Sequence, residues 1–102
     1  MYRFRRLYWR EDRKEHVERR YTTEEVEEAL FDDPFCVVRR GPRSDKNPDQ
    51  FIYYAYGSTG SGERITVVLL DEGAGVALPV TARAMNFSER KYYEERRNQR
   101  HD

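Results

Sequence analysis

The chain has 102 residues, of which 37% are hydrophobic, and that share is enough for one modest core but not for two. Its 19 Lys and Arg residues balance its 19 Asp and Glu residues, so no overall charge excess draws it onto nucleic acid or an anionic membrane. No apolar run is long enough for a membrane span, and the N-terminus lacks the apolar stretch of a signal peptide. We therefore expect a single cytoplasmic domain over residues 1–102.

Positive and negative side chains are segregated along the chain. Residues 1–20 hold eight basic and four acidic side chains, whereas residues 21–35 hold six acidic side chains and no basic one. Residues 36–50 and 73–102 are basic again. If the fold brings the basic parts together, they form a positive surface suited to phosphates; ordinary solvated charge is the alternative. The single cysteine, Cys36, lies in an apolar context and is interpreted as a core residue, which excludes a disulfide framework and a Cys-rich zinc site.

The N-terminal third predicts one strand and two helices. Aromatic residues and arginines roughly alternate over residues 2–9, as in a half-buried strand, and the polar stretch over residues 11–20 favours a short exposed helix. Thr22 and Glu25 have the spacing of a capping box, which starts a second helix with its apolar positions on one face. Pro34 ends that helix, because the residue before a proline is disfavoured in the helical region.

Four further strands are expected after the second helix. They cover residues 35–38, 51–56, 64–70 and 76–81, and glycine-containing turns join the last three, as in an antiparallel meander. The third of these strands is continuously apolar and is expected at the centre of the sheet. The segment 41–50 has two prolines and no apolar residue, which predicts an exposed, mobile loop.

The C-terminal part predicts an irregular strand and a final helix. Pro79 favours an edge position or a bulge in the last strand. Asn86 and Glu89 have capping-box spacing and start the last helix, whereas residues 97–102 are expected to form a disordered tail. The order β-α-α-β-β-β-β-α predicts an α+β domain, with an antiparallel sheet of four to five strands, two N-terminal helices and one C-terminal helix.

Motifs for most kinds of catalysis are missing from the sequence. No glycine-rich phosphate loop opens a helix, and the two histidines, His16 and His101, do not have metal-ligand spacing. No serine lies in a nucleophile-elbow context. We therefore expect neither a metal nor a cofactor.

Arg64 and Arg83 are the strongest candidates for a functional site. Arg64 begins the most apolar strand and Arg83 ends its neighbour, so each guanidinium emerges from a rigid margin of the sheet. Two guanidiniums can hold a phosphodiester bidentately and stabilise the charge of a pentacoordinate transition state, which allows RNA cleavage without a metal. Pairing with the acidic segment 21–35 is the alternative for both arginines.

RNA cleavage also needs a group that takes the proton of the 2′-hydroxyl. The candidates are His16, Glu25, Glu89 and Tyr93. Each of them could instead have a purely structural role. His16 could lie on the surface or pair with a carboxylate, the two glutamates could cap helices, and Tyr93 could pack at the edge of the core. Trp9 lies near several arginines and either stacks on bases or packs under a helix.

Several stretches of the sequence resemble the BrnT family. They are residues 62–70, 80–85, 88–93 and 23–31, Asp33-Pro34, Trp9, and the polar stretch that contains His16. The specific part is the spacing from Arg83 to Glu89 and Tyr93. The resemblance implies a RelE-like fold and a small bacterial toxin that cleaves RNA without a metal, leaves 2′,3′-cyclic phosphate ends, and is neutralised by a ribbon-helix-helix antitoxin. With the resemblance, the predicted catalytic residues are Arg64, Arg83, His16, Glu89 and Tyr93, and the predicted RNA-binding residues are Trp9, Arg20 and Arg90.

The sequence departs from the family at one informative place. The family usually carries a basic residue, a His, a Gly and an aliphatic residue before the second helix, where this chain has Arg19-Arg20-Tyr21. If that His moves protons, either this protein is inactive or His16, one helical turn earlier, takes its place. The alternative function is therefore a non-catalytic interaction module, which binds a partner protein without cleaving RNA.

Overall fold

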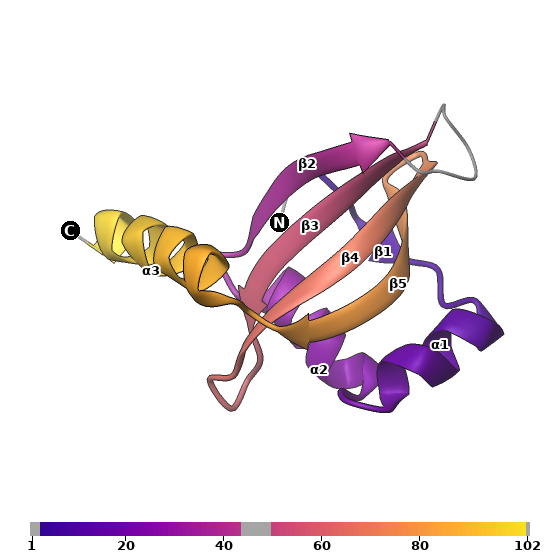
Figure 1. The fold of residues 1–102 in the computed structure, drawn as a ribbon, viewed down its shortest axis with the longest axis horizontal. Helices are drawn as coiled ribbons and strands as arrows, with labels where there is room; N and C mark the ends of the chain where they lie inside the picture. The colour runs from indigo at the N-terminus through magenta and orange to yellow at the C-terminus, as the bar shows by residue number, and fades with distance from the viewer. Residues whose placement is uncertain (1–2, 44–49, 102) are drawn as a thin grey trace.

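The computed structural model describes residues 3–43 and 50–101, which form an α+β fold (Figure 1). The elements in chain order are β1 (Arg6–Leu7), α1 (Glu11–Glu18), α2 (Thr23–Glu27), η1 (Glu28–Asp32), β2 (Val37–Arg43), β3 (Phe51–Ser58), β4 (Arg64–Gly73), β5 (Val76–Ala84) and α3 (Phe87–His101). This is the predicted order of strands and helices, with a π-helical segment, η1, directly after α2.

The five strands form a mixed sheet in the order β1-β5-β4-β3-β2, with β4 at the centre as its apolar sequence predicts. The pairs β2–β3, β3–β4 and β4–β5 are antiparallel, but β1 runs parallel to β5. The prediction of a purely antiparallel sheet is therefore wrong. The chain leaves β1 through α1 and α2 rather than through a hairpin, so no tight turn forces β1 into an antiparallel pair.

One face of the sheet carries the core. Because strand side chains alternate between faces, every second residue of β3 and β4 points to this side. The buried cluster on it joins strand residues to residues of the N-terminal strand and helices: Phe4, Val17, Tyr21, Val26, Ala29, Leu30, Tyr53, Ala55, Ile65, Val67, Leu69, Ala77 and Ala82. Gly57 is required where β3 passes η1, since a Cβ there would lie 2.2 Å from the carbonyl oxygen of Ala29.

The last strand, β5, contains a β-bulge. Val68 pairs with Thr81 and Leu69 pairs with Pro79, so Val80 is the extra residue. The irregularity predicted from Pro79 is confirmed. Thr81 follows the bulge and pairs with Val68 of β4. Both side chains point to the side of the sheet that faces away from the core.

Both predicted capping boxes are present. The hydroxyl oxygen of Thr22 accepts a hydrogen bond from the amide of Glu25 at 3.0 Å, and the carboxylate of Glu25 accepts one from the amide of Thr22 at 2.9 Å. Asn86 and Glu89 make the same reciprocal pair, at 2.8 and 2.9 Å. Each pair satisfies amides that would otherwise lack a partner at the start of a helix.

Two segments differ from the sequence-based expectation. β2 extends to Arg43, so the first residues of the predicted loop over 41–50 belong to a strand; residues 44–49 lie outside the described residues. α3 continues to His101, whereas disorder is expected from residue 97 onward. Figure 1 shows α3 projecting beyond one end of the sheet. None of the helices within residues 3–43 and 50–101 is long and apolar enough to cross a membrane.

Candidate nucleic-acid interface

The face of the sheet that points away from the core presents two rows of side chains. Cross-strand partners lie on the same face, so the strand register fixes the order within each row. The first row is Arg39, Tyr54, Val68 and Thr81, and the second row is Val37, Tyr56, Thr66 and Arg83. We call these eight residues the α3 face, because α3 contacts the second row. Neighbouring strands lie about 4.8 Å apart, so each row spans about 14 Å.

The side chains of the first row are partly accessible to solvent. Arg39 is exposed, and Tyr54, Val68 and Thr81 are each half-buried. The row therefore offers a guanidinium at one end, a phenol ring near the middle and a hydroxyl at the other end. Guanidinium groups bind phosphates, and aromatic rings stack on bases, so the composition of this row is typical of single-stranded nucleic-acid binding.

Arg83 forms a bidentate ion pair with Glu89 at the start of α3. Its two terminal nitrogens donate to the two carboxylate oxygens of Glu89, at 2.6 and 2.8 Å. The same carboxylate accepts hydrogen bonds from the hydroxyl of Thr66 at 3.0 Å and from the amide of Asn86 at 2.9 Å. Glu89 therefore caps α3, which is its structural alternative, and also forms an ion pair with Arg83. The partner of Arg83 comes from α3 and not from the acidic segment 21–35.

These contacts set the protonation state of Glu89. Its partial burial opposes ionisation, but the hydrogen bonds from Arg83, Asn86 and Thr66 outweigh that effect and lower the pKa of the carboxyl. The hydrogen bond to Glu89 likewise raises the pKa of Arg83. Glu89 is therefore a weak base that is already an acceptor of four hydrogen bonds. This geometry suits Glu89 for holding Arg83 better than for taking a proton from substrate.

Arg64 is also paired with α3. Its Nε donates to Glu94 at 2.7 Å, and a terminal nitrogen donates to the hydroxyl of Ser58 at 2.7 Å. The guanidinium carbon lies 5.2 Å from the centre of the Tyr93 ring, within the range of a cation–π contact. The hydrogen bond to Glu94 raises the pKa of Arg64, so the group is a permanent cation. The two predicted arginines thus reach the same helix from adjacent strands.

Tyr93 is completely buried and takes part in a network that ends on Asp33. Its hydroxyl donates to the carboxylate of Asp33 at 2.6 Å and accepts a hydrogen bond from Arg97 at 3.1 Å. Asp33 also accepts hydrogen bonds from the amides of Phe35 and Ser58, both at 2.9 Å. Burial, and then the hydrogen bond to Asp33, raise the pKa of Tyr93 to about 12. The hydrogen bond from the Tyr93 hydroxyl to Asp33 therefore links α3 to the end of η1.

His16 is the predicted acid-base residue that remains exposed. Its Nε2 lies 3.2 Å from the hydroxyl of Thr81, at the end of the first row. Thr81 and Arg83 are two residues apart on β5 and point to the same face, which places them roughly 7 Å apart along the strand. The fold therefore brings α1 and the end of β5 together at the margin of the α3 face, although 65 residues separate His16 from Thr81 in the sequence.

The other predicted residues lie apart from this group. Trp9 is half-buried and packs against the core, which matches its structural alternative. Arg20 and Arg90 are exposed. Among the described residues, no hydrogen bond or ion pair connects either arginine with the other predicted site residues. Glu25 serves its own capping box.

An aromatic and basic cluster between the α3 face and α3 itself is absent from the residues predicted from the sequence. The guanidinium carbon of Arg39 lies 4.4 Å from the centre of the Tyr92 ring, and that of Arg96 lies 5.6 Å from it. Tyr92 packs edge-on against Tyr56 with a centroid distance of 6.1 Å. Burial, and then the charge of Glu89, raise the pKa of Tyr56, so this phenol stays protonated. The sequence signal for the cluster is that β2 is rich in arginine and the neighbouring β3 is rich in tyrosine.

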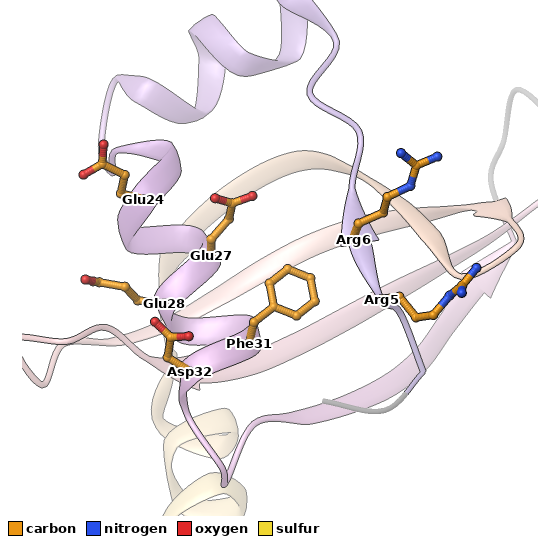
Figure 2. A pocket seen from close by; sticks show the side chains of 7 residues that line it. All are labelled: Arg5, Arg6, Glu24, Glu27, Glu28, Phe31 and Asp32. Atoms are coloured by element: carbon orange, nitrogen blue, oxygen red, sulfur yellow. The ribbon is translucent and has the colours of Figure 1, made fainter.

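Two cavities lie outside the α3 face. One has a volume of about 530 Å³ and is lined by Arg5 and Arg6 on one side and by the acidic side chains of α2 and η1 on the other (Figure 2). The Phe31 ring lies between the two groups. The acidic segment therefore lines a different part of the surface from Arg83 and His16. The other cavity, of about 300 Å³, lies between η1, the β3–β4 turn and α3, and it is lined in part by Arg64 and Arg97.

No family model and no curated protein matches this sequence. The resemblance to the BrnT family therefore stays a prediction from its motifs. Across residues 3–43 and 50–101, no group of three or more His, Cys, Asp and Glu side chains is arranged to hold a metal ion.

Proposed function

We propose that the chain is a BrnT-like toxin of the RelE-like group, which acts in the cytoplasm and cleaves single-stranded RNA on the α3 face without a metal. The observation that supports this most directly is the contact of His16 with Thr81, two residues before Arg83 on β5, at the end of the row that starts with Arg39. A ribbon-helix-helix antitoxin is the proposed protein partner.

The RNA backbone follows the first row across the sheet. Arg39 contacts one phosphate, and a base stacks on the half-buried ring of Tyr54. The scissile phosphate lies at the other end of the row, between Arg83 and His16. The row of about 14 Å is long enough to contact a short single-stranded segment.

The reaction needs one proton acceptor and one cation. A ring nitrogen of His16 takes the proton of a 2′-hydroxyl while that oxygen forms a bond to phosphorus. Arg83 stabilises the added negative charge of the pentacoordinate phosphorus. The bond from phosphorus to the 5′-oxygen then breaks, and the leaving oxygen takes a proton from water. The proton on His16 neutralises the hydroxide that remains, so the products are a 2′,3′-cyclic phosphate and a 5′-hydroxyl.

Glu89 and Tyr93 have supporting roles in this proposal. Glu89 orients Arg83 through the bidentate pair, and Tyr93 fixes α3 to Asp33. Arg64 stabilises the same helix through Glu94. These three residues position the α3 face and do not transfer protons.

The test is cleavage of an end-labelled single-stranded RNA in the presence of EDTA. Wild type is compared with His16→Ala and Arg83→Gln, and the matched controls are Glu15→Gln on the same helix as His16 and Arg6→Gln on β1. The proposal expects wild type and controls to release 2′,3′-cyclic phosphate ends, and both site variants to lose at least about 100-fold in rate. Cleavage that survives in both folded site variants would refute the assignment.

A second candidate function is binding of a protein partner without turnover. The observation that favours it is the pairing of both predicted arginines with glutamates of α3, because a phosphate has to compete with these carboxylates. Under this alternative, wild type leaves RNA intact in the same assay, and substituting Arg39 weakens partner binding but changes no chemistry.

A further inference from the structure

We infer that the cavity between η1, the β3–β4 turn and α3 binds a guanine base. The cavity has a volume of about 300 Å³, at the lower end of the range for small-molecule sites. It is distinct from the α3 face, because α3 directs Tyr92 toward Tyr56 on that face and Arg97 toward the cavity. The inference therefore does not depend on the proposed ribonuclease activity.

Two of the residues that line the cavity carry guanidinium groups that are held in place and have donors to spare. Arg97 stacks on Phe35, with its guanidinium carbon 4.6 Å from the ring centre, and Arg64 stacks on Tyr93. Within the described chain, Arg64 uses its Nε and one terminal nitrogen, and Arg97 uses one terminal nitrogen. The remaining N–H groups are available to acceptors on a ligand.

The cavity is also lined by carboxylates from η1. Asp32 is exposed and, among the residues that the structure describes, makes no hydrogen bond or ion pair. Glu28 uses one oxygen to accept a hydrogen bond from the amide of Gly60 at 3.1 Å, and its other oxygen accepts none within the described ranges. Asp32 and Glu28 are four residues apart and so lie on the same side of the helical segment. Together they offer acceptors to a ligand that carries N–H donors.

The charge balance of the cavity excludes a simple anion as its preferred ligand. Three carboxylates, from Glu28, Asp32 and Asp33, face two guanidinium groups. A free phosphate would gain from the arginines but would be repelled by the carboxylates. A neutral ligand with donors at one edge and acceptors at another can pair with both the carboxylates and the guanidinium groups.

Guanine is the nucleobase with this pattern. Its O6 and N7 are adjacent acceptors, which a guanidinium binds bidentately, and its N1–H and N2–H groups are adjacent donors, which a carboxylate binds in the same way. Adenine and cytosine each offer a single amino donor beside an acceptor, so they leave a carboxylate oxygen unpaired. The source of the base is either a free guanine nucleotide or a guanosine of RNA.

The experiment is calorimetric titration of the full chain with guanosine, adenosine, cytidine and inosine. Guanosine is expected to bind at least about tenfold more tightly than adenosine and cytidine, and more tightly than inosine, which lacks the 2-amino group. Asp32→Asn should weaken the binding of guanosine by about tenfold and remove the preference for guanosine over inosine. The matched control is Glu24→Gln, an exposed carboxylate of α2 that lines the other cavity.

Two further ligands identify the source of the base. Tighter binding of guanosine 5′-monophosphate than of guanosine supports a free nucleotide, and tighter binding of an RNA with a 3′-terminal guanosine supports RNA. Equal binding of guanosine and adenosine, no binding of guanosine, or unchanged guanosine binding by folded Asp32→Asn would each overturn the inference. None of these binding results bears on cleavage at the α3 face, because the His16 and Arg83 variants test that site separately.

Discussion

Replacing Glu89 with Gln tests whether Arg83 is available for a phosphate. The substitution keeps the shape of the side chain and a carbonyl oxygen for Thr66 and Asn86, but it removes the negative charge and places an amide N–H₂ against the guanidinium. A charge-assisted hydrogen bond contributes about 1.5–3 kcal/mol to stability. The Arg83 side chain is 35% exposed, so solvent screening reduces that to about 1–1.5 kcal/mol. Loss of the carboxylate at the start of α3 adds about 0.5 kcal/mol.

We therefore expect Glu89→Gln to lower the free energy of unfolding by about 2 kcal/mol in urea titrations. We also expect it to bind single-stranded RNA more tightly. Removing one negative charge about 4 Å from a bound phosphate is worth about 1 kcal/mol at the surface, which corresponds to roughly fivefold in affinity. Fluorescence anisotropy with a labelled oligonucleotide measures this gain, which should shrink as salt increases.

The matched control is Glu95→Gln, which removes the same charge from an exposed position on the same helix. Its stability should stay within about 0.5 kcal/mol of wild type, and its RNA affinity should rise less than that of Glu89→Gln. A folded Glu89→Gln protein with unchanged or weaker RNA binding would refute the reasoning, because Arg83 would then gain nothing from losing its partner.

Two further predictions concern stability. Gly57→Ala should lower the free energy of unfolding in urea by about 3 kcal/mol, because the added Cβ would lie 2.2 Å from a backbone oxygen of Ala29. Gly60→Ala should lower it less, since its Cβ meets only the end of the flexible Glu28 side chain. Equal losses of stability would show that the close approach of β3 to η1 does not limit stability. Burial is the largest cause of raised pKa values of about 12 in three groups: Tyr21, Cys36 and Tyr93. A group with a raised folded-state pKa stabilises the fold below its ordinary pKa and loses that contribution as pH rises toward the folded value. For Tyr93 the loss falls between pH 10 and about 12. Thermal unfolding followed by circular dichroism should therefore show a shallower decline over this range in Tyr93→Phe than in wild type, and an identical slope would argue against a buried Tyr93 hydroxyl.

The features that the sequence predicted well are local ones. The capping boxes at Thr22 and Asn86 depend on residues three positions apart, and the bulge in β5 follows from a proline within the strand itself. The central position of β4 follows from its continuous apolar run. In each case the physical cause lies within a short stretch of chain.

The features that it missed depend on contacts between distant segments. The two-residue strand β1 has its partner 70 positions later, and no local pattern specifies that pairing or its parallel direction. Pairing with the acidic segment 21–35 was the alternative for Arg64 and Arg83, but their ion-pair partners are Glu94 and Glu89 of α3. The stacking of Arg39 on Tyr92 likewise joins β2 to α3 and has no local signal.

The pairing of the first strand with the last determines when the protein can fold during synthesis. At about 5–20 residues per second, Val76 is added several seconds after its partner Arg6. Until then the segment that carries Phe4, which is 1% exposed in the folded chain, lacks the backbone hydrogen bonds to Gly75 and Ala77 that hold it against β5. Thr81, which fixes His16, and the whole of α3 follow still later. The α3 face therefore cannot assemble before α3 has been synthesised, and a chain that stops short of α3 lacks the partners of Arg64 and Arg83.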